Sequence, residues 1–310
     1  MLPPTITVNA LQDGMDSPSS GAKDSMILVR LIGGLGNQMF QYEAGRALAA
    51  RLDAPLLLDL RDFRRYRLRS YGLDRMQIQA RPATAWELAR WPIWLRNRRW
   101  PVERFGLASR WFREDRMRFS PAFANLTGTV GLDGYFQSEL YFADVRQTLL
   151  HEFRPRAPLS RENNVLAETI RAVAGASLHV RRGDYVSDPK TSAVHGVCSP
   201  AYYQRAISLL RERYEDLRVF VFSDDPAWCR ANLSLDGATF VEGNGAAPEC
   251  DIFLMAQCRH HIIANSSFSW WGAWLADQPG TTIAPRPWFS DGTLRDDDLI
   301  PSAWLRLPRD

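Results

Sequence analysis

Short apolar runs alternate with longer segments of helical character along the chain, and polar or glycine-containing turns separate them. The apolar runs predict buried strands at Met26–Leu31, Pro55–Asp59, Thr129–Asp133, Ala174–Leu178, Arg218–Phe222 and His261–Ala264. The intervening segments predict helices at Met39–Ala49, Glu162–Ala172, Tyr202–Tyr214, Asp251–Cys258 and Trp270–Ala276. Apolar strands that alternate with helices are typical of parallel sheets, so the sequence predicts an α/β protein.

Two prolines, Pro155 and Pro158, fall within the segment Glu152–Ser160 and predict a linker between two domains. We expect an N-terminal domain over residues 26–155 and a C-terminal domain over residues 156–310. Residues 1–25 are rich in Pro, Asp, Ser and Gly and lack the basic and apolar regions of a signal peptide, which predicts a disordered leader. No run of 18 apolar residues occurs, so a transmembrane helix is not expected.

A glycine-rich loop, Gly33–Gln38, connects the first predicted strand to the first predicted helix. In this arrangement free backbone N–H groups and a helix N-terminus can meet an anion. The spacing G-G-x-G-N-Q is neither the dinucleotide fingerprint nor a Walker A loop, because no G-x-G-x-x-G and no Gly-Lys-Ser/Thr occurs there. The loop therefore indicates either an anion site or an ordinary tight connection.

A second motif, His179–Tyr185, follows the predicted strand Ala174–Leu178 and contains the adjacent arginines Arg181 and Arg182. In an open α/β sheet, ligands bind at the carboxyl ends of the strands. The planar fork of an arginine side chain matches phosphate oxygens. The motif predicts a diphosphate-binding site, and the alternative is a solvated charged turn after a strand.

Together with Ser223–Pro226 and Asn265–Gly272, these two motifs closely resemble those of the bacterial α-1,2-fucosyltransferases, glycosyltransferase family 11. The resemblance runs over residues 26–287 and includes Gly134–Glu139 and Ser199–Tyr203. It implies a GT-B fold, in which two Rossmann-like domains face a cleft, with the acceptor on the N-terminal side and the GDP-sugar on the C-terminal side. It also implies inverting transfer of L-fucose from GDP-β-L-fucose to the 2-hydroxyl of a terminal galactoside, forming an α-1,2 linkage in bacterial surface-glycan synthesis.

Guanine needs a hydrogen-bond acceptor, which a carboxylate supplies, and two aspartates follow the predicted strand Arg218–Phe222. The resemblance assigns nucleoside contacts to one of these aspartates and to the motif histidine. A serine pair before the last predicted helix suits a phosphate site, and an N-cap is the alternative reading for that pair and for one aspartate. We expect the donor to contact His179, Arg182, Asp224, Asp225, Ser266, Ser267, Phe268, Gly34 and Gly36.

The reaction needs stabilisation of the leaving diphosphate and a base for the acceptor proton, unless the glycosidic bond breaks early and leaves an oxocarbenium-like sugar. The resemblance places Arg181 at the β-phosphate and Asn37 near the reacting bond. Asp184 is the carboxylate nearest in sequence to Arg181 and is our candidate base, although it could instead orient the arginines. Glu139 and His195 are the alternative bases. We expect the acceptor to contact Gln38, Gln137, Glu139 and His195.

Neither a metal site nor a cofactor beyond the GDP-sugar is predicted. Asp224 and Asp225 are adjacent and do not form a D-x-D motif, and Asp296–Asp298 is interpreted as solvated surface. The five histidines are scattered apart from the pair His260 and His261. The four cysteines show no C-x-x-C spacing, which favours reduced thiols in a cytoplasmic protein.

Charge is unevenly distributed, although the net charge is only +3. The segment Arg61–Arg118 has 16 arginines and 6 acidic residues, so it carries +10 and the remainder carries −7. It also contains Trp86, Trp91, Trp94, Trp100 and Trp111. Arginine with tryptophan is typical of surfaces that meet anionic membranes or nucleic acids. The alternative is a helical layer with solvated arginines and core tryptophans.

One hypothesis is therefore peripheral contact with the inner face of the cell membrane, where a lipid-linked acceptor would lie. We do not expect a nucleic-acid partner, but an Arg/Trp-rich nucleic-acid-binding protein is the non-enzyme alternative. A nucleotide-binding oxidoreductase is disfavoured because the glycine spacing fails, although Asp59 ends the second predicted strand. Within the enzyme interpretation, the alternative is a different fucosyl linkage or another GDP-sugar donor.

Overall fold

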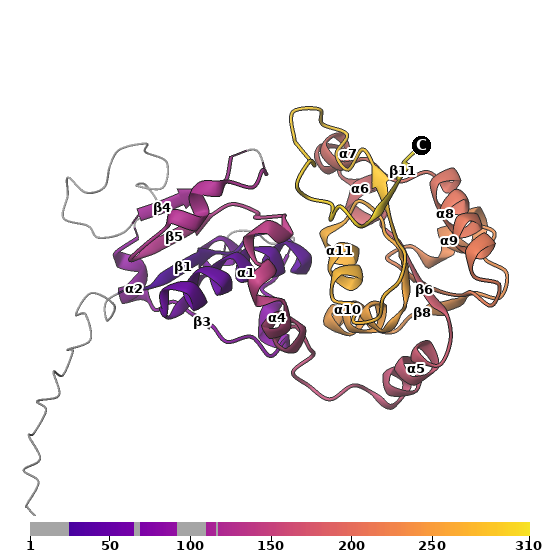
Figure 1. Cartoon of the computed structure of the whole chain (residues 1–310), viewed down its shortest axis with the longest axis horizontal. Helices are drawn as coiled ribbons and strands as arrows, with labels where there is room; N and C mark the ends of the chain where they lie inside the picture. The colour runs from indigo at the N-terminus through magenta and orange to yellow at the C-terminus, as the bar shows by residue number, and fades with distance from the viewer. Residues whose placement is uncertain (1–24, 65–68, 92–109, 116) are drawn as a thin grey trace, which may run out of the picture.

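The computed structural model describes residues 25–64, 69–91, 110–115 and 117–310. Almost all of the predicted leader and much of the basic segment Arg61–Arg118 lie outside the described residues. Two α/β halves lie side by side in Figure 1, and the chain passes between them along one connecting segment before α5. Each half contains one parallel sheet, which gives the GT-B arrangement expected from the sequence resemblance.

The N-terminal half is a five-stranded sheet in the order β3-β2-β1-β5-β4, with every pair parallel. Its strands are β1 (Ile27–Arg30), β2 (Leu56–Asp59), β3 (Arg81–Pro82), β4 (Arg110–Arg113) and β5 (Val130–Asp133). Its described helices are α1 (Leu35–Leu52), α2 (Ala85–Ala89) and α4 (Arg146–Glu152). Short 3₁₀ turns occur at Arg61–Arg64, Leu73–Arg75, Pro121–Asn125, Glu139–Tyr141 and Ala143–Val145.

The C-terminal half is a six-stranded parallel sheet in the order β11-β10-β9-β6-β7-β8. Its strands are β6 (Gly175–Val180), β7 (Arg218–Ser223), β8 (Thr239–Val241), β9 (His260–Ile262), β10 (Thr282–Arg286) and β11 (Leu305–Pro308). Its helices are α5 (Arg161–Arg171), α6 (Gly183–Ser187), α7 (Pro189–His195), α8 (Pro200–Arg213), α9 (Pro226–Asn232), α10 (Pro248–Gln257) and α11 (Ser267–Trp274).

Two element boundaries differ from the sequence predictions in ways that matter for the site. Strand β6 extends to Val180, so His179 lies inside the strand, because this stretch continues to pair with β7 and His179 stands opposite Phe222. Helix α1 begins at Leu35, so Asn37 and Gln38 belong to its first turn and not to a loop. The backbone N–H groups of Asn37 and Gln38 both donate to the carbonyl oxygen of Gly34, so the helix starts directly after the Gly34 cap.

Helices α1 and α11 join the two halves through a continuous aromatic core. Phe40 on α1 lies 4.5 Å from the ring of Trp270 and 4.8 Å from that of Trp271, both on α11. The indole Nε1 of Trp271 donates to the carbonyl oxygen of Gly36 at 3.0 Å. All these side chains are buried, so apolar burial holds the halves in one relative position.

Gly36 is the point of closest approach between these helices. A Cβ atom at this position would lie 2.6 Å from both the backbone N of Phe268 and the carbonyl carbon of Ser267. Neither atom can move without displacing the start of α11. A side chain at residue 36 would therefore separate the two halves at the site where both supply functional residues.

Gly36→Ala should destabilise the fold by roughly 1–3 kcal/mol, as overpacking at a rigid contact does. The matched control is Gly34→Ala, because the nearest atoms to a Cβ at Gly34 are 3.9 Å away and belong to the flexible side chain of Arg69. Urea denaturation of both variants measures the difference. Equal stability of Gly36→Ala and Gly34→Ala would contradict the importance of this contact.

Candidate active site

The predicted diphosphate motif lies at the carboxyl ends of two neighbouring strands. Arg181 and Arg182 follow β6, and Asp224 and Asp225 follow β7, its parallel neighbour. The two arginines and the two aspartates therefore meet at one edge of the sheet, where open α/β sheets bind ligands. The donor contacts expected for these four residues stay a prediction.

Arg181 is held by two carboxylates. Its guanidinium forms ion pairs with Asp184 and, at 2.9 Å, with Oδ2 of Asp224, and it lies 5.6 Å from the centre of the Tyr185 ring. Asp184 also accepts a hydrogen bond from Arg69, which comes from the N-terminal half. This ion-pair network thus crosses between the halves and fixes Arg181 in orientation.

Both oxygens of Asp184 are occupied by guanidinium groups, one from Arg181 and one from Arg69. Burial opposes ionisation of Asp184, but the two guanidinium groups outweigh it and hold the pKa of this carboxyl below its usual range. A carboxylate with a lowered pKa is a weak proton acceptor. The geometry favours the orienting role that the sequence left open for Asp184 over the role of base.

Arg182 is braced in a different way. Its Nε lies 3.2 Å from Oδ2 of Asp225, and its guanidinium lies 4.1 Å from the centre of the Trp228 ring. Asp225 is also the N-cap of α9, where Oδ1 accepts from the backbone N–H of Trp228 at 3.0 Å. The N-cap alternative therefore holds for Asp225. In Asp224, one carboxylate oxygen pairs with Arg181 and the other accepts a hydrogen bond from the backbone N–H of Arg182.

His179 is almost fully buried beneath the start of α11, with its ring 5.6 Å from that of Phe268. Burial, together with the positive charge of Arg181, lowers the pKa of His179 to about 3. The ring is therefore neutral at physiological pH. Its Nδ1 is buried and has no partner among the described residues. The nucleoside contact expected for His179 stays a prediction.

A hydrogen-bonded chain links the glycine-loop residues to α11. Gln137 donates from Nε2 to Oδ1 of Asn37 at 2.8 Å, and Ser267 donates from Oγ to the same oxygen at 2.7 Å. Ser266 is the N-cap of α11 and accepts from the N–H of Phe268, as the N-cap alternative predicted. Asn37, Gln137 and Ser267 thus form a bridge where the two halves meet.

Gln38 does not face the cleft, contrary to the sequence prediction. Its side chain is fully buried, with Nε2 donating to the carbonyl oxygens of Gly33 and Ser70, and Oε1 accepting from the N–H of Gly72. These three bonds fix the backbone beside Arg69. Gln38 is therefore a structural residue. Its amide N–H groups and its amide oxygen are already hydrogen-bonded to backbone, so they are not free to bind an acceptor sugar. Gly36 likewise serves helix packing, whereas Gly34 lies near Arg69.

Glu139 is not brought to the arginine cluster. Its carboxylate accepts from Nε1 of Trp274, in the last turn of α11, whereas Ser267 and Phe268 lie in the first. Eight helical residues span about 12 Å, so the two ends are well separated. Glu139 instead lines a separate cavity of about 380 Å³ together with Arg146 and His261. The position of Glu139 argues against its roles as base and as acceptor contact.

His195 does lie beside the cluster. Its ring stacks on Tyr185 with 4.8 Å between centroids and an interplanar angle of 10°, and Tyr185 adjoins Arg181. Burial is the main cause that lowers the pKa of His195, opposed by Asp184 and assisted by Arg181. A neutral imidazole can accept a proton, so His195 remains a candidate for that role.

Two residues of the site escaped the sequence analysis. Arg69 lies within the basic segment, where no feature of the sequence distinguished it from its neighbours, and only the fold brings it to Asp184. Glu114, which follows β4, accepts on Oε2 from the backbone N–H groups of Tyr135 and Phe136 at 2.8 and 2.9 Å. Phe136 has a left-handed backbone, with φ of 54°, which an L-residue adopts only when its surroundings hold it.

Glu114 therefore stabilises the turn that leads into Gln137 and the bridge to Asn37. Burial raises the pKa of Glu114 to about 7, although its two backbone hydrogen bonds act in the opposite direction. The other oxygen, Oε1, is buried without a partner among the described residues.

Other sequence interpretations are only partly supported. Asp296 is not solvated surface, because it pairs with Arg306 at 2.6 Å and accepts from the N–H of Trp288. Among the tryptophans of the basic segment, Trp91 is buried against Trp111 whereas Trp86 is 77% exposed. Trp94 and Trp100 lie outside the described residues. All four cysteines are buried and free.

No group of three or more His, Cys, Asp or Glu side chains is arranged to hold a metal ion in the part of the chain that the structure describes. Within the same described ranges, no helix has both the length and the apolar character needed to cross a membrane.

Two parallel-sheet domains with an arginine cluster between them define a GT-B glycosyltransferase. The family model for glycosyl transferase family 11 matches residues 122–307. An α-1,2-colitosyltransferase of Escherichia coli is 36% identical over 92% of this chain and 100% of its own length. The O-antigen biosynthesis glycosyltransferase WbnK of the same species is 30% identical over 89% of this chain and 99% of its own length. The chain therefore belongs to glycosyltransferase family 11.

More distant similarity extends to animals and plants. Galactoside α-(1,2)-fucosyltransferase 2 of Sus scrofa is 28% identical over 92% of this chain and 78% of its own length. Among solved structures, a GDP complex of Arabidopsis thaliana FUT1 superposes with a TM-score of 0.52 at 12% identity, covering 83% of this chain and 70% of that one. This structural similarity supports the fold.

If Asp184 orients Arg181, the substitutions Arg181→Ala and Asp184→Asn should both weaken GDP binding. We expect a loss of about 2 kcal/mol for Arg181→Ala, as for a lost charge-assisted contact, and a combined loss smaller than the sum, because the residues act together. Calorimetry with GDP measures each. Asp216→Asn, an exposed position before β7, is the control. Normal GDP affinity with slow turnover in Asp184→Asn would instead identify a base.

Glu114→Gln should change how stability depends on pH. Between pH 4.5 and 7 native Glu114 retains a proton that the unfolded chain has lost, so the free energy of unfolding falls as pH rises through this window. Removing the titrating group should reduce that fall by up to about 3 kcal/mol. Urea denaturation at pH 4.5 and 7.5 measures it, with exposed Glu242→Gln as control. Parallel pH profiles for Glu114→Gln and the unaltered chain would refute the shift.

Proposed function

We propose that this chain transfers L-fucose from GDP-β-L-fucose to the 2-hydroxyl of a terminal galactoside with inversion, forming an α-1,2 linkage during synthesis of a bacterial surface glycan. The observation that carries the proposal is the arginine cluster between the two halves. Arg181 is fixed by Asp184 and Asp224 at the carboxyl end of β6, and Arg69 reaches the same cluster from the other half. Such a preorganised cation matches a leaving diphosphate.

The proposed division of labour follows from the fixed positions of these groups. Arg181 stabilises the negative charge that grows on the β-phosphate as the glycosidic bond breaks, and the first N–H groups of α11 add to this field. Arg182 supports the loop through Asp225 and Trp228. Because a guanidinium group and a helix N-terminus supply the positive charge, no metal ion or further cofactor is required in the proposed mechanism.

Removal of the proton from the acceptor hydroxyl is the step for which the site offers no strong base. Asp184 is committed to two arginines, so we favour early cleavage of the bond to the leaving group, with an oxocarbenium-like sugar that needs little help from a base. His195, neutral and stacked on Tyr185 beside Arg181, is then the side chain that we propose accepts the proton. Asn37, in the bridge to Ser267, is proposed to lie near the reacting bond.

A second candidate donor is GDP-colitose. One relative, 36% identical over 92% of this chain, is named as an α-1,2-colitosyltransferase. Colitose differs from fucose by the absence of the 3-hydroxyl, so a site that hydrogen-bonds this hydroxyl would reject colitose. The name of the second relative, an O-antigen biosynthesis glycosyltransferase, supports a role in surface-glycan synthesis for either donor. Peripheral contact with an anionic membrane stays a prediction from the basic segment.

The deciding experiment offers purified protein GDP-fucose, GDP-colitose and GDP-mannose with a panel of β-galactosides, and identifies products by mass and linkage analysis. We expect fucose on O2 of the terminal galactose, with the α-anomeric configuration, and full activity in excess EDTA. Faster transfer from GDP-colitose would select the second donor. Loss of activity in EDTA with rescue by Mg²⁺ or Mn²⁺ would reject the proposed role of the arginines. Absence of transfer from all three donors would reject the function.

A further inference from the structure

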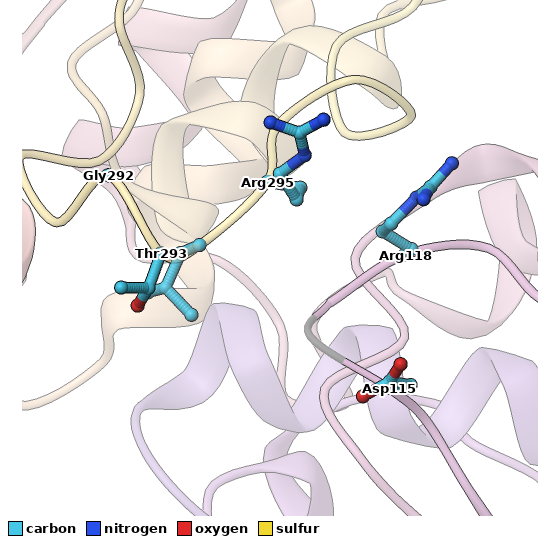
Figure 2. A pocket seen from close by; sticks show the side chains of 6 residues that line it. Asp115, Arg118, Gly292, Thr293 and Arg295 are labelled. Atoms are coloured by element: carbon cyan, nitrogen blue, oxygen red, sulfur yellow. The ribbon is translucent and has the colours of Figure 1, made fainter.

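A cavity of about 600 Å³ lies between the two halves of the molecule. One wall follows β4 and contributes Asp115 and Arg118, and the other follows β10 and contributes Gly292, Thr293, Leu294 and Arg295. Figure 2 shows Arg118 and Asp115 on one side of the space and Arg295 and Thr293 on the other. None of these residues belongs to a motif that the sequence assigned to donor or acceptor binding.

The two walls are held together at the cavity. Oδ2 of Asp298, from the C-terminal half, accepts from the backbone N–H of Phe119, from the N-terminal half, at 3.2 Å. The hydroxyl of Tyr141 donates to the carbonyl oxygen of Arg118 at 3.0 Å. The backbone of the N-terminal wall is therefore held both to the C-terminal half and within its own half.

The C-terminal wall of the cavity also connects to the arginine cluster. The N–H groups of Ser290 and Asp291 both donate to the carbonyl oxygen of Val194. Next to them, the ring of Phe289 lies 5.8 Å from that of His195, which stacks on Tyr185 beside Arg181. A ligand in the cavity would thus lie on the same side of the fold as the proposed diphosphate site.

The N-terminal wall connects to the same site by another route. Asp115 directly follows Glu114, whose carboxylate holds the turn at Tyr135 and Phe136. That turn leads into Gln137 and its hydrogen bond to Asn37. Contacts thus link the N-terminal wall to Asn37 and the C-terminal wall to Tyr185 beside Arg181.

The charge of the lining is unusual for a sugar site. Leu294 is the one apolar side chain among the lining residues, whereas ligand pockets are ordinarily lined by apolar and aromatic groups. Arg118 is exposed and forms no ion pair with any described residue. Within the described ranges Arg295 pairs only with Asp297, at 3.4 Å, and both of these side chains are more than half exposed. Ion pairs this exposed neutralise little, so two guanidinium groups remain available.

We propose that this cavity is the acceptor subsite and that it selects acceptors carrying a negatively charged group, a carboxylate or a phosphate, on the unit attached to the galactose. This inference rests on the proposed function and specifies its substrate class. Arg118 and Arg295 bind the anionic group through the planar fork of the guanidinium. Asp115 and Thr293 supply a hydrogen-bond acceptor and a hydroxyl for the sugar hydroxyls.

The test compares three acceptors with the same terminal galactose: neutral methyl β-lactoside, methyl galactosyl-β-glucuronide and galactosyl-β-N-acetylglucosamine 1-phosphate. With GDP-fucose as donor, we expect kcat/KM to be about tenfold higher or more for an anionic acceptor, as for one charge-assisted contact. In the double variant Arg118→Gln/Arg295→Gln, the ratio of anionic to neutral acceptor should fall towards one. Preference for the glucuronide identifies a carboxylate, and preference for the phosphate identifies a phosphate.

Arg230→Gln is the matched control, because Arg230 is a comparably exposed arginine on α9, paired with Glu242. It should leave the ratio as it is in the unaltered chain. Equal kcat/KM for charged and neutral acceptors, or an unchanged ratio in the double variant, would overturn the inference.

Direct binding separates this inference from the proposed function. Calorimetric titration of each anionic disaccharide into the protein saturated with GDP needs no turnover. Binding that the double variant loses supports the subsite even if no fucose is transferred, in which case the proposed reaction is wrong and the cavity is retained. Transfer to methyl β-lactoside without measurable binding of either anionic disaccharide would reject the anionic subsite and retain the proposed reaction.

Discussion

The contact between the first turns of α1 and α11 is the constraint on which the rest of the site depends. Gly36 allows the backbone of α1 to reach the start of α11, and Phe40 packs against two tryptophans directly behind that point. Two helix N-termini, one from each half, consequently face the same region. Asn37 and Ser267 can share a hydrogen bond only because this approach is so close. Apolar packing behind the site therefore sets the geometry of the polar groups in front of it.

The electrostatics of the site follow from the same arrangement. Arg69, Arg181 and Arg182 are each paired with an aspartate in the free protein, so the cluster carries no large excess of charge and its arginines are already oriented. These cations can stabilise the charge of an incoming diphosphate without first being ordered, which is the advantage of preorganisation. The aspartates limit how strongly the free site attracts other anions. Selectivity for the GDP-sugar must then come from groups around the diphosphate as well as from the arginines.

Local pattern was sufficient to predict most of the strands and helices and to place Arg181 and Asp224 just after two of the strands, because strand ends and their loops are encoded by contiguous residues. Local pattern was not sufficient to predict the positions and contacts of Arg69, Gln38 or Glu114. Arg69 reaches Asp184 across 115 positions of sequence, and no short-range rule distinguishes it from the other arginines around it. Gln38 resembled an active-site residue because it follows a glycine loop, yet the early start of α1 turns it into the protein interior.

The residues proposed for donor recognition and those proposed for acceptor recognition lie on different kinds of structure. The arginine cluster sits at strand ends and helix starts, where Asp225 is both an N-cap and an ion-pair partner, so a substitution there disturbs the fold and the site together. Arg118 and Arg295 project from exposed segments after β4 and β10, and their side chains support no buried contact among the described residues. Such segments can change sequence at little cost in stability. A fold built in this way can keep one donor chemistry and still acquire different acceptors.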